Sequence, residues 1–115
     1  MTNIKMHSLA KVLARHHQVT ASELIGHSRV RSITLPRFKF CWIARYRLGH
    51  STTAIAKFLS GRDHTTVVHA TRQAERLGLI CDQTVNDILD EAKDQTVIDM
   101  DRLKLDAGVY CGNQA

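Results

Sequence analysis

The sequence predicts an all-α protein, a helix-turn-helix bundle of about five to six helices. Apolar residues recur at helical spacing in several segments of the chain, as at Met6, Leu9 and Leu13. Residues that favour helix starts precede several of these segments, and glycines that can end a helix or form a turn follow them. At 115 residues, the chain is long enough for one domain with a modest core.

The first two helices are expected near the N-terminus. The apolar repeat predicts a helix over about residues 3–17. Thr-Ala-Ser-Glu at 20–23 is a capping box that opens a short second helix, and Gly26 can end it. His16 and His17 are not expected to bind a metal, because no cysteine or carboxylate at ligand spacing accompanies them.

A loop and a long third helix are expected next. Residues 27–35 are expected to form the loop, which carries Arg29 and Arg31. Pro36 suits the first turn of the third helix, because its missing N–H would be unpaired there in any case. This helix is expected to run to about Leu48, since a glycine follows.

The third helix carries two apolar stripes, although a single buried face needs only one. One stripe suits the core and is formed by Phe40, Ile43, Ala44 and Leu48. The other consists of the aromatic residues Phe38, Trp42 and Tyr46, spaced at i, i+4 and i+8. We expect this aromatic stripe to pack under the C-terminal segment. A protein-partner surface, or contact with a DNA backbone, is the alternative interpretation.

A helix-turn-helix is expected near the middle of the chain. Ser51 can cap a short helix that ends near Leu59, and Gly61 can adopt the positive φ of a tight turn. Asp63 can cap the second helix by accepting hydrogen bonds from the amides that follow it. That helix has one buried stripe at helical spacing, formed by Val67, Ala70, Thr71, Ala74 and Leu77.

The outward side of this second helix suits a DNA duplex. Short hydrogen-bonding side chains stand at its start and longer basic ones further along, namely His64, Thr65, Thr66, His69, Arg72 and Arg76. Threonine methyl groups can contact thymine, histidine and threonine polar atoms can reach base edges, and arginines can hold phosphates. Besides capping the helix, Asp63 can accept from a cytosine amino group. Thr66 can alternatively bond back to the helix start.

Charge is divided unevenly along the chain. Residues 1–78 contain 13 Lys+Arg and 3 Asp+Glu, a balance of +10, whereas residues 79–115 contain 3 and 8, a balance of −5. A basic body points to a polyanionic partner, and an acidic tail points to a separate role.

Residues 61–67, Gly-Arg-Asp-His-Thr-Thr-Val, closely resemble the motif of the C-terminal DNA-binding domain of the bacterial chromosomal replication initiator DnaA. The similarity extends back through residues 28–37, which look like that domain's basic loop and the start of its long helix, and covers roughly residues 4–78. The resemblance implies a Trp-repressor-like fold, a DNA-binding domain over residues 1–94, and double-stranded DNA as the partner.

The resemblance also assigns roles to individual residues. Arg29 matches the arginine that family members insert into the minor groove, where A·T-rich DNA concentrates negative potential. Base readout is expected from Arg29, Asp63, His64, Thr65 and Thr66. Contact with the DNA backbone, or support of the groove, is expected from Arg31, Arg37, Arg45, Lys57, Arg62, His69 and Arg72. Arg62 can equally pair with an acidic neighbour. Phe38 departs from the family, which often has glutamine there.

Neither catalysis nor nucleotide binding is expected. Asp63 and His64 are adjacent at a helix start, where side chains should point apart, and no Walker-type glycine-rich loop occurs. No catalytic residue, metal or cofactor is therefore predicted, and duplex should be bound without ATP and without melting. No apolar run approaches a membrane span and no signal-peptide core is present, so we expect a cytoplasmic, nucleoid-associated protein with reduced cysteines.

A last amphipathic helix is expected from about Gln83 to Lys93, followed by an acidic, partly mobile extension over residues 95–115. Residues 96–105 fit either a short helix or an alternating strand. The predicted function is recognition of a short initiator-box-like site by a transcriptional regulator, or by a competitor or modulator of replication initiation. The alternative is an adaptor that binds a protein partner, or a second copy, through the acidic tail or the aromatic stripe. The tail can also fold across the basic face and weaken non-specific binding.

Overall fold

The computed structural model describes residues 4–26 and 30–104, which form six helices and no strand. The helices are α1 (Met6–His16), α2 (Ala21–Ile25), α3 (Arg31–Tyr46), α4 (Thr52–Phe58), α5 (His64–Arg76) and α6 (Asp82–Lys104). The expected all-α helix-turn-helix bundle is confirmed. None of the described helices is both long enough and apolar enough to cross a membrane.

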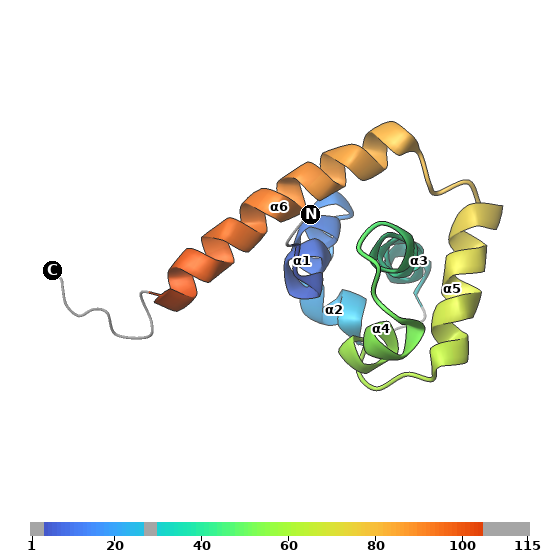
Figure 1. Cartoon of the computed structure of the whole chain (residues 1–115). Coiled ribbons are helices and arrows are strands. Elements are labelled where there is room, and N and C mark those ends of the chain that lie inside the picture. The colour runs from blue at the N-terminus through green and yellow to red at the C-terminus, as the bar shows by residue number, and fades with distance from the viewer. Residues whose placement is uncertain (1–3, 27–29, 105–115) are drawn as a thin grey trace, which may run out of the picture.

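Helix α3 lies at the centre of the bundle (Figure 1). It contacts α1 and α2 on one side and α5 on the opposite side, and α4 lies between α2 and α5. Phe40 and Ile43 of α3 are fully buried among the largest core side chains, which include Leu9, Leu13, Leu24, Ile55, Leu59 and Val67. Burying each such side chain stabilises the fold by about 1.5–3 kcal/mol. The core therefore fixes α5 firmly to the rest of the molecule.

Helix α3 begins five residues before Pro36, so the expected loop over residues 27–35 is wrong from Arg31 onward. Pro36 lies inside the helix, where its missing N–H removes one backbone hydrogen bond. Ile33 and Pro36 are both buried, and they continue the stripe of Phe40 by two more turns. Burial of this added apolar surface offsets the lost hydrogen bond.

The aromatic stripe of α3 faces α5 rather than the C-terminal segment, which corrects the first expectation for it. Trp42 Nε1 donates to Glu75 Oε2 of α5 at 3.2 Å, and Phe38 lies near the start of the same helix. Trp42 also stacks in a tilted arrangement with Tyr46, which remains 58% exposed. Trp42 thus helps to hold α5 in place, and Phe38 borders a hollow beside that helix.

Helix α6 is one continuous helix of 23 residues, about 34 Å long at 1.5 Å per residue. It packs along α1 and extends away from α5 (Figure 1). Its second half is anchored to α1 by two polar residues: Lys5 N donates to Thr96 Oγ1 at 3.3 Å, and Asp99 accepts from Ser8 Oγ at 2.8 Å and from Lys11 Nζ at 3.0 Å.

The structure answers two questions about the part of the C-terminal segment that it describes. Residues 96–104 are helical, and the helix runs without interruption past residue 94. The described part of the segment also lies on α1, so it does not cover the face that α5 presents (Figure 1). The remainder of the expected extension, residues 105–115, lies outside the described residues.

Candidate nucleic-acid interface

Helices α4 and α5 form the predicted helix-turn-helix. The Ser51 hydroxyl caps α4 by accepting from the amide of Ala54 at 3.1 Å. The turn contains two residues with positive φ, Ser60 at 65° and Gly61 at 73°. Only the second was expected, because glycine is the residue that ordinarily adopts this conformation. Asp63 caps α5 as predicted, accepting from the amide of Thr65 at 3.2 Å.

The Asp63 carboxylate is held in its charged form at the start of α5. Hydrogen bonds from the backbone and side chain of Thr65 lower the pKa of Asp63, and His64 adds a smaller effect in the same direction. His64 Nδ1 lies 3.2 Å from Asp63 Oδ1, so the expectation that these two side chains point apart is wrong. Both are more than 60% exposed, and the contact therefore orients the imidazole at the surface.

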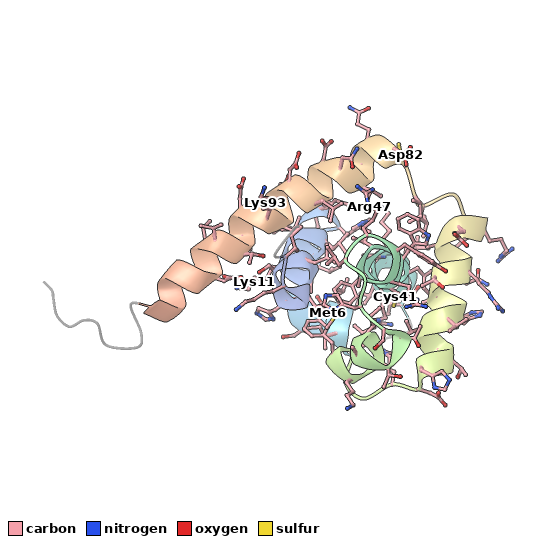
Figure 2. All side chains as sticks on the ribbon, viewed as in Figure 1. Met6, Lys11, Cys41, Arg47, Asp82 and Lys93 are labelled. Atoms are coloured by element: carbon pink, nitrogen blue, oxygen red, sulfur yellow. The ribbon has the colours of Figure 1, made fainter. Side chains whose placement is uncertain are left out.

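The outer side of α5 is a continuous polar and basic surface. Its exposed side chains are His64, Thr65, Thr66, His69, Arg72 and Arg76. The opposite side is buried through Val67, Ala70, Thr71 and Ala74. Side chains project from the outer side of α5, away from the bundle (Figure 2). Because the buried side is fixed on α3, the exposed side chains are displayed on a rigid helix.

Two further basic residues of the predicted set are exposed around the helix-turn-helix. Arg45 lies in the last turn of α3, and its Nη1 donates to the carbonyl of His50 at 3.4 Å. Lys57 lies in the last turn of α4. Both are accessible, so each can reach a phosphate.

Arg37 occupies a different environment from the predicted one. It is only 6% exposed, and its guanidinium donates to the carbonyl oxygens of Leu24 at 2.8 Å and of Glu23 at 3.1 Å. Burial, followed by the nearby charge of Arg62, lowers the pKa of Arg37 from its ordinary value. In this structure Arg37 joins α3 to α2 and does not lie on the surface where a phosphate contact was expected.

Arg62 and Ser60 complete the same connection from the helix-turn-helix turn. Ser60 Oγ donates to the carbonyl of Ile25 at 3.1 Å, and Arg62 Nη2 donates to the carbonyl of Gly26. The last carbonyl groups of a helix lack partners within the helix. Here four successive carbonyls, over residues 23–26, accept from Arg37, Ser60 and Arg62.

Sequence reasoning missed this connection because the donors and acceptors are 13 to 36 positions apart. Arg29 lies outside the described residues, so its predicted approach to the minor groove is not placed. Gly26 and Val30 are the described neighbours of that segment, and Gly26 is bound to the turn by Arg62. Arg31 is the first residue of α3 rather than a loop residue.

Acidic side chains are few around this surface. Residues 1–78 contain only Glu23, Asp63 and Glu75. Glu23 closes the capping box of α2 and Glu75 accepts from Trp42. Among the described residues, no group of three histidine, cysteine or carboxylate side chains is placed to hold a metal ion. The helix-turn-helix therefore presents an exposed, mainly basic surface suited to a polyanion.

Comparison with known proteins agrees with the helix-turn-helix seen in the structure. Residues 6–74 match the family model of the bacterial DnaA protein helix-turn-helix. The chain is 34% identical over 93 residues to the chromosomal replication initiator protein DnaA of Rhodopseudomonas palustris, covering 80% of this chain and 19% of the relative. It is 35% identical over 74 residues to the DnaA protein of Brucella abortus, covering 64% and 15%.

A third relative, the DnaA protein of Dechloromonas aromatica, is 35% identical over 75 residues, which are 65% of this chain and 16% of the relative. The chain thus spans less than a fifth of the length of these relatives. The matched region contains α1 to α5 nearly complete, including the turn and the exposed start of α5. The chain belongs to the bacterial DnaA helix-turn-helix family.

Proposed function

We propose that this protein binds a short double-stranded DNA site in a sequence-specific manner, with the start of α5 in the major groove. The observation that supports this most directly is the exposed run Asp63–Thr66 on a helix whose other side is fixed in the core. A helix presented N-terminus first suits a groove, because helix-turn-helix proteins read base edges with the first residues of the second helix.

Each exposed group has chemistry that suits a role in the complex. His64, Thr65 and Thr66 provide polar atoms and methyl groups for base edges. Arg45, Lys57 and Arg72 are charged and accessible, and they are the proposed phosphate contacts. Arg29 is the proposed minor-groove contact. Binding to chromosomal duplex would place the protein at the nucleoid.

The regulatory part of the proposal follows from site occupancy. A bundle of this size covers a short duplex site when it binds, and other proteins are then excluded from that site. We therefore propose that the protein acts as a transcriptional regulator, or as a competitor at initiator-box-like sites. The family relationship favours boxes of the initiator type as its targets.

Selection of bound duplexes from a random pool, followed by sequencing, tests the proposal. Enrichment of an initiator-like box would support competition at such boxes, and a different motif would support a dedicated regulator. Thr65→Ala should then weaken binding to the enriched duplex by about tenfold, the loss of one base contact, and binding to random duplex by much less. Thr53→Ala, an exposed threonine on α4, is the matched control. Equal losses on both duplexes would refute base readout.

A second candidate is association with a protein through α6. Val97 and Ile98 are adjacent on this helix and 55% and 57% exposed, so they offer a small apolar surface to a partner. Sedimentation velocity on the chain and on the Val97→Glu/Ile98→Glu variant tests self-association. A dimer that the variant abolishes would support it, and a monomer at all concentrations for both proteins would exclude it.

A further inference from the structure

Helix α6 carries a row of acidic side chains on the side that faces away from the bundle. Asp87, Asp90 and Asp94 are exposed and follow one another at three and four positions, so they lie on one side of the helix, about 4.5 and 6 Å apart along its axis. The opposite side is buried through Val85 and Ile88. Side chains project outward along this part of α6 (Figure 2). We call these three aspartates the acidic row.

The charge of the acidic row is not balanced within the molecule. Among the described residues, none of its carboxylates forms a salt bridge, whereas Glu91 and Asp99 of the same helix each pair with a basic residue of α1. Lys93 is the only lysine or arginine in α6 up to residue 99. An unbalanced row of this kind attracts a positively charged surface on a partner.

Helix α5 presents a matching surface. His69, Arg72 and Arg76 are exposed and also follow one another at three and four positions, so their spacing along the helix axis equals that of the acidic row. Carboxylates form strong, charge-assisted hydrogen bonds with guanidinium groups. Glu75, the acidic residue within α5, accepts from Trp42 of α3 and so does not lie in this row. We call His69, Arg72 and Arg76 the basic row.

The two rows of one molecule cannot meet. The acidic row lies between two anchors: Arg47 Nη2 donates to Asn86 Oδ1 at 3.0 Å before it, and Lys11 Nζ lies 3.0 Å from Asp99 Oδ1 after it. Helix α6 runs along α1 and away from α5 (Figure 1). A basic partner for the acidic row must therefore come from another molecule, and a second copy of this chain supplies one with the same spacing.

We propose that the acidic row of one copy binds the basic row of a second copy. The two surfaces differ, so each pair keeps one unused row of each sign, and further copies can add head to tail. The contact is electrostatic, which distinguishes it from an apolar association through Val97 and Ile98. It also occupies side chains of α5 that are expected to meet DNA. The associated chain should therefore not bind duplex through α5, a consequence that rests on the proposed function.

Sedimentation velocity of the full chain without DNA tests the association. At about 20 mM salt, where surface charges are weakly screened, the sedimentation coefficient should rise with protein concentration. We expect a midpoint on the order of 100 µM, as for a small and weak interface. At about 200 mM salt, the affinity should fall about tenfold. A chain that stays monomeric at low salt and several times the expected midpoint would overturn the proposal.

Two variants each remove one row. Asp87→Asn/Asp90→Asn/Asp94→Asn neutralises the acidic row, and Arg72→Gln/Arg76→Gln neutralises the arginines of the basic row. Each should weaken self-association by about tenfold or more, and both should keep the native fold in thermal melts because the changed residues are exposed. Wild-type association of either variant would overturn the proposal.

Two control variants leave both rows intact. Lys5→Gln/Arg15→Gln removes two exposed positive charges at the ends of α1, and the affinity between copies should not change. A loss equal to that of the basic-row variant would show a non-specific charge effect. Val97→Glu/Ile98→Glu adds negative charge to α6 and should not weaken the contact. A loss of association in this variant would show an apolar interface instead.

Mixing the two row variants tests the head-to-tail arrangement directly. The acidic-row variant keeps its basic row, and the basic-row variant keeps its acidic row. The mixture should therefore form one-to-one pairs with the affinity of the unchanged chain, although each variant alone is monomeric at the same concentration. A mixture without pairs would overturn the contact between unlike rows.

Duplex is added last. A random-sequence duplex at equal concentration should disperse the associated chain, because DNA presents a higher density of negative charge to α5 than three carboxylates do. Association that persists on duplex would overturn the competition. The measurements without DNA do not depend on the proposed function, so failure of the association and failure of DNA binding can be told apart.

Discussion

Replacing Arg37 by methionine distinguishes a buried connection from a DNA contact. The family resemblance places a DNA-touching residue at this position, whereas the structure gives Arg37 an exposed fraction of 6% and two backbone acceptors in α2. Methionine keeps a long apolar stem and removes the charge and the donors. The two roles predict opposite patterns of stability and salt dependence.

The expected loss of stability follows from the carbonyl oxygens of Leu24 and Glu23, which accept hydrogen bonds from Arg37. Each buried acceptor left without a donor costs about 1–3 kcal/mol, and removal of a buried charge recovers part of that loss. We therefore expect the free energy of unfolding to fall by about 2–4 kcal/mol, and the melting temperature to fall by about 10–20 °C. Because no phosphate contact is lost, the dependence of DNA affinity on salt should keep its slope.

Arg45→Met is the matched control, because Arg45 is exposed and its hydrogen bond to the carbonyl of His50 is long, at 3.4 Å. Its stability should change by no more than about 0.5 kcal/mol. If Arg45 contacts a phosphate, the slope of log affinity against log salt should fall in magnitude by about 0.9. Thermal melts and titrations of the selected duplex between about 50 and 200 mM salt measure both quantities. A stable Arg37→Met protein with a reduced salt slope would refute the buried role.

Three further outcomes are expected. Gly61→Ala should lower stability by about 1 kcal/mol in urea unfolding, because φ is +73° and no atom lies within 4 Å of the added methyl group; a larger loss would indicate a steric clash. Asp99→Ala should destabilise the second half of α6 by about 1–2 kcal/mol, as measured by hydrogen exchange. Its affinity for duplex should not change, and a loss of affinity would show that α6 contributes to DNA binding. Burial, then the charge of Lys39 and a neighbouring histidine, lowers the pKa of His17. The unfolded state then binds more protons, so stability should fall as pH drops below about 6.5, and His17→Gln should flatten this decline.

The parts of the fold that depend on local chemistry were predictable. The Thr20–Glu23 capping box, the caps at Ser51 and Asp63, and the positive φ of Gly61 all involve residues within a few positions of one another. The buried stripe of α5 was also predictable, since it follows from helical spacing alone. Each of these expectations is confirmed.

The errors arose where distant partners decide the structure. The sequence after residue 94 fitted either a helix or a strand, because residues such as Thr96 and Asp99 are polar. In the structure both accept hydrogen bonds from the N-terminal part of the chain, from Lys5 and Ser8, and α6 continues through them. Arg37 is charged, and a charged residue is expected at the surface unless a buried acceptor is known. Ser60 adopts a positive φ that its sequence does not suggest, and its hydroxyl is bound to the carbonyl of Ile25. Helix α3 starts before the expected residue because Ile33 is buried in the core. This burial depends on distant parts of the chain, so the local sequence does not predict it.

Hydrogen bonds join the end of α2 to the helix-turn-helix turn. The segment that carries Arg29 begins directly after Gly26, and Asp63, the N-cap of α5, comes directly after Arg62. Arg62 joins these two points, and Arg37 and Ser60 hold the preceding carbonyls of α2. The positive guanidinium groups also suit a helix C-terminus, where the dipole is negative. Gly26, the described residue directly before that segment, is therefore joined to the helix-turn-helix turn.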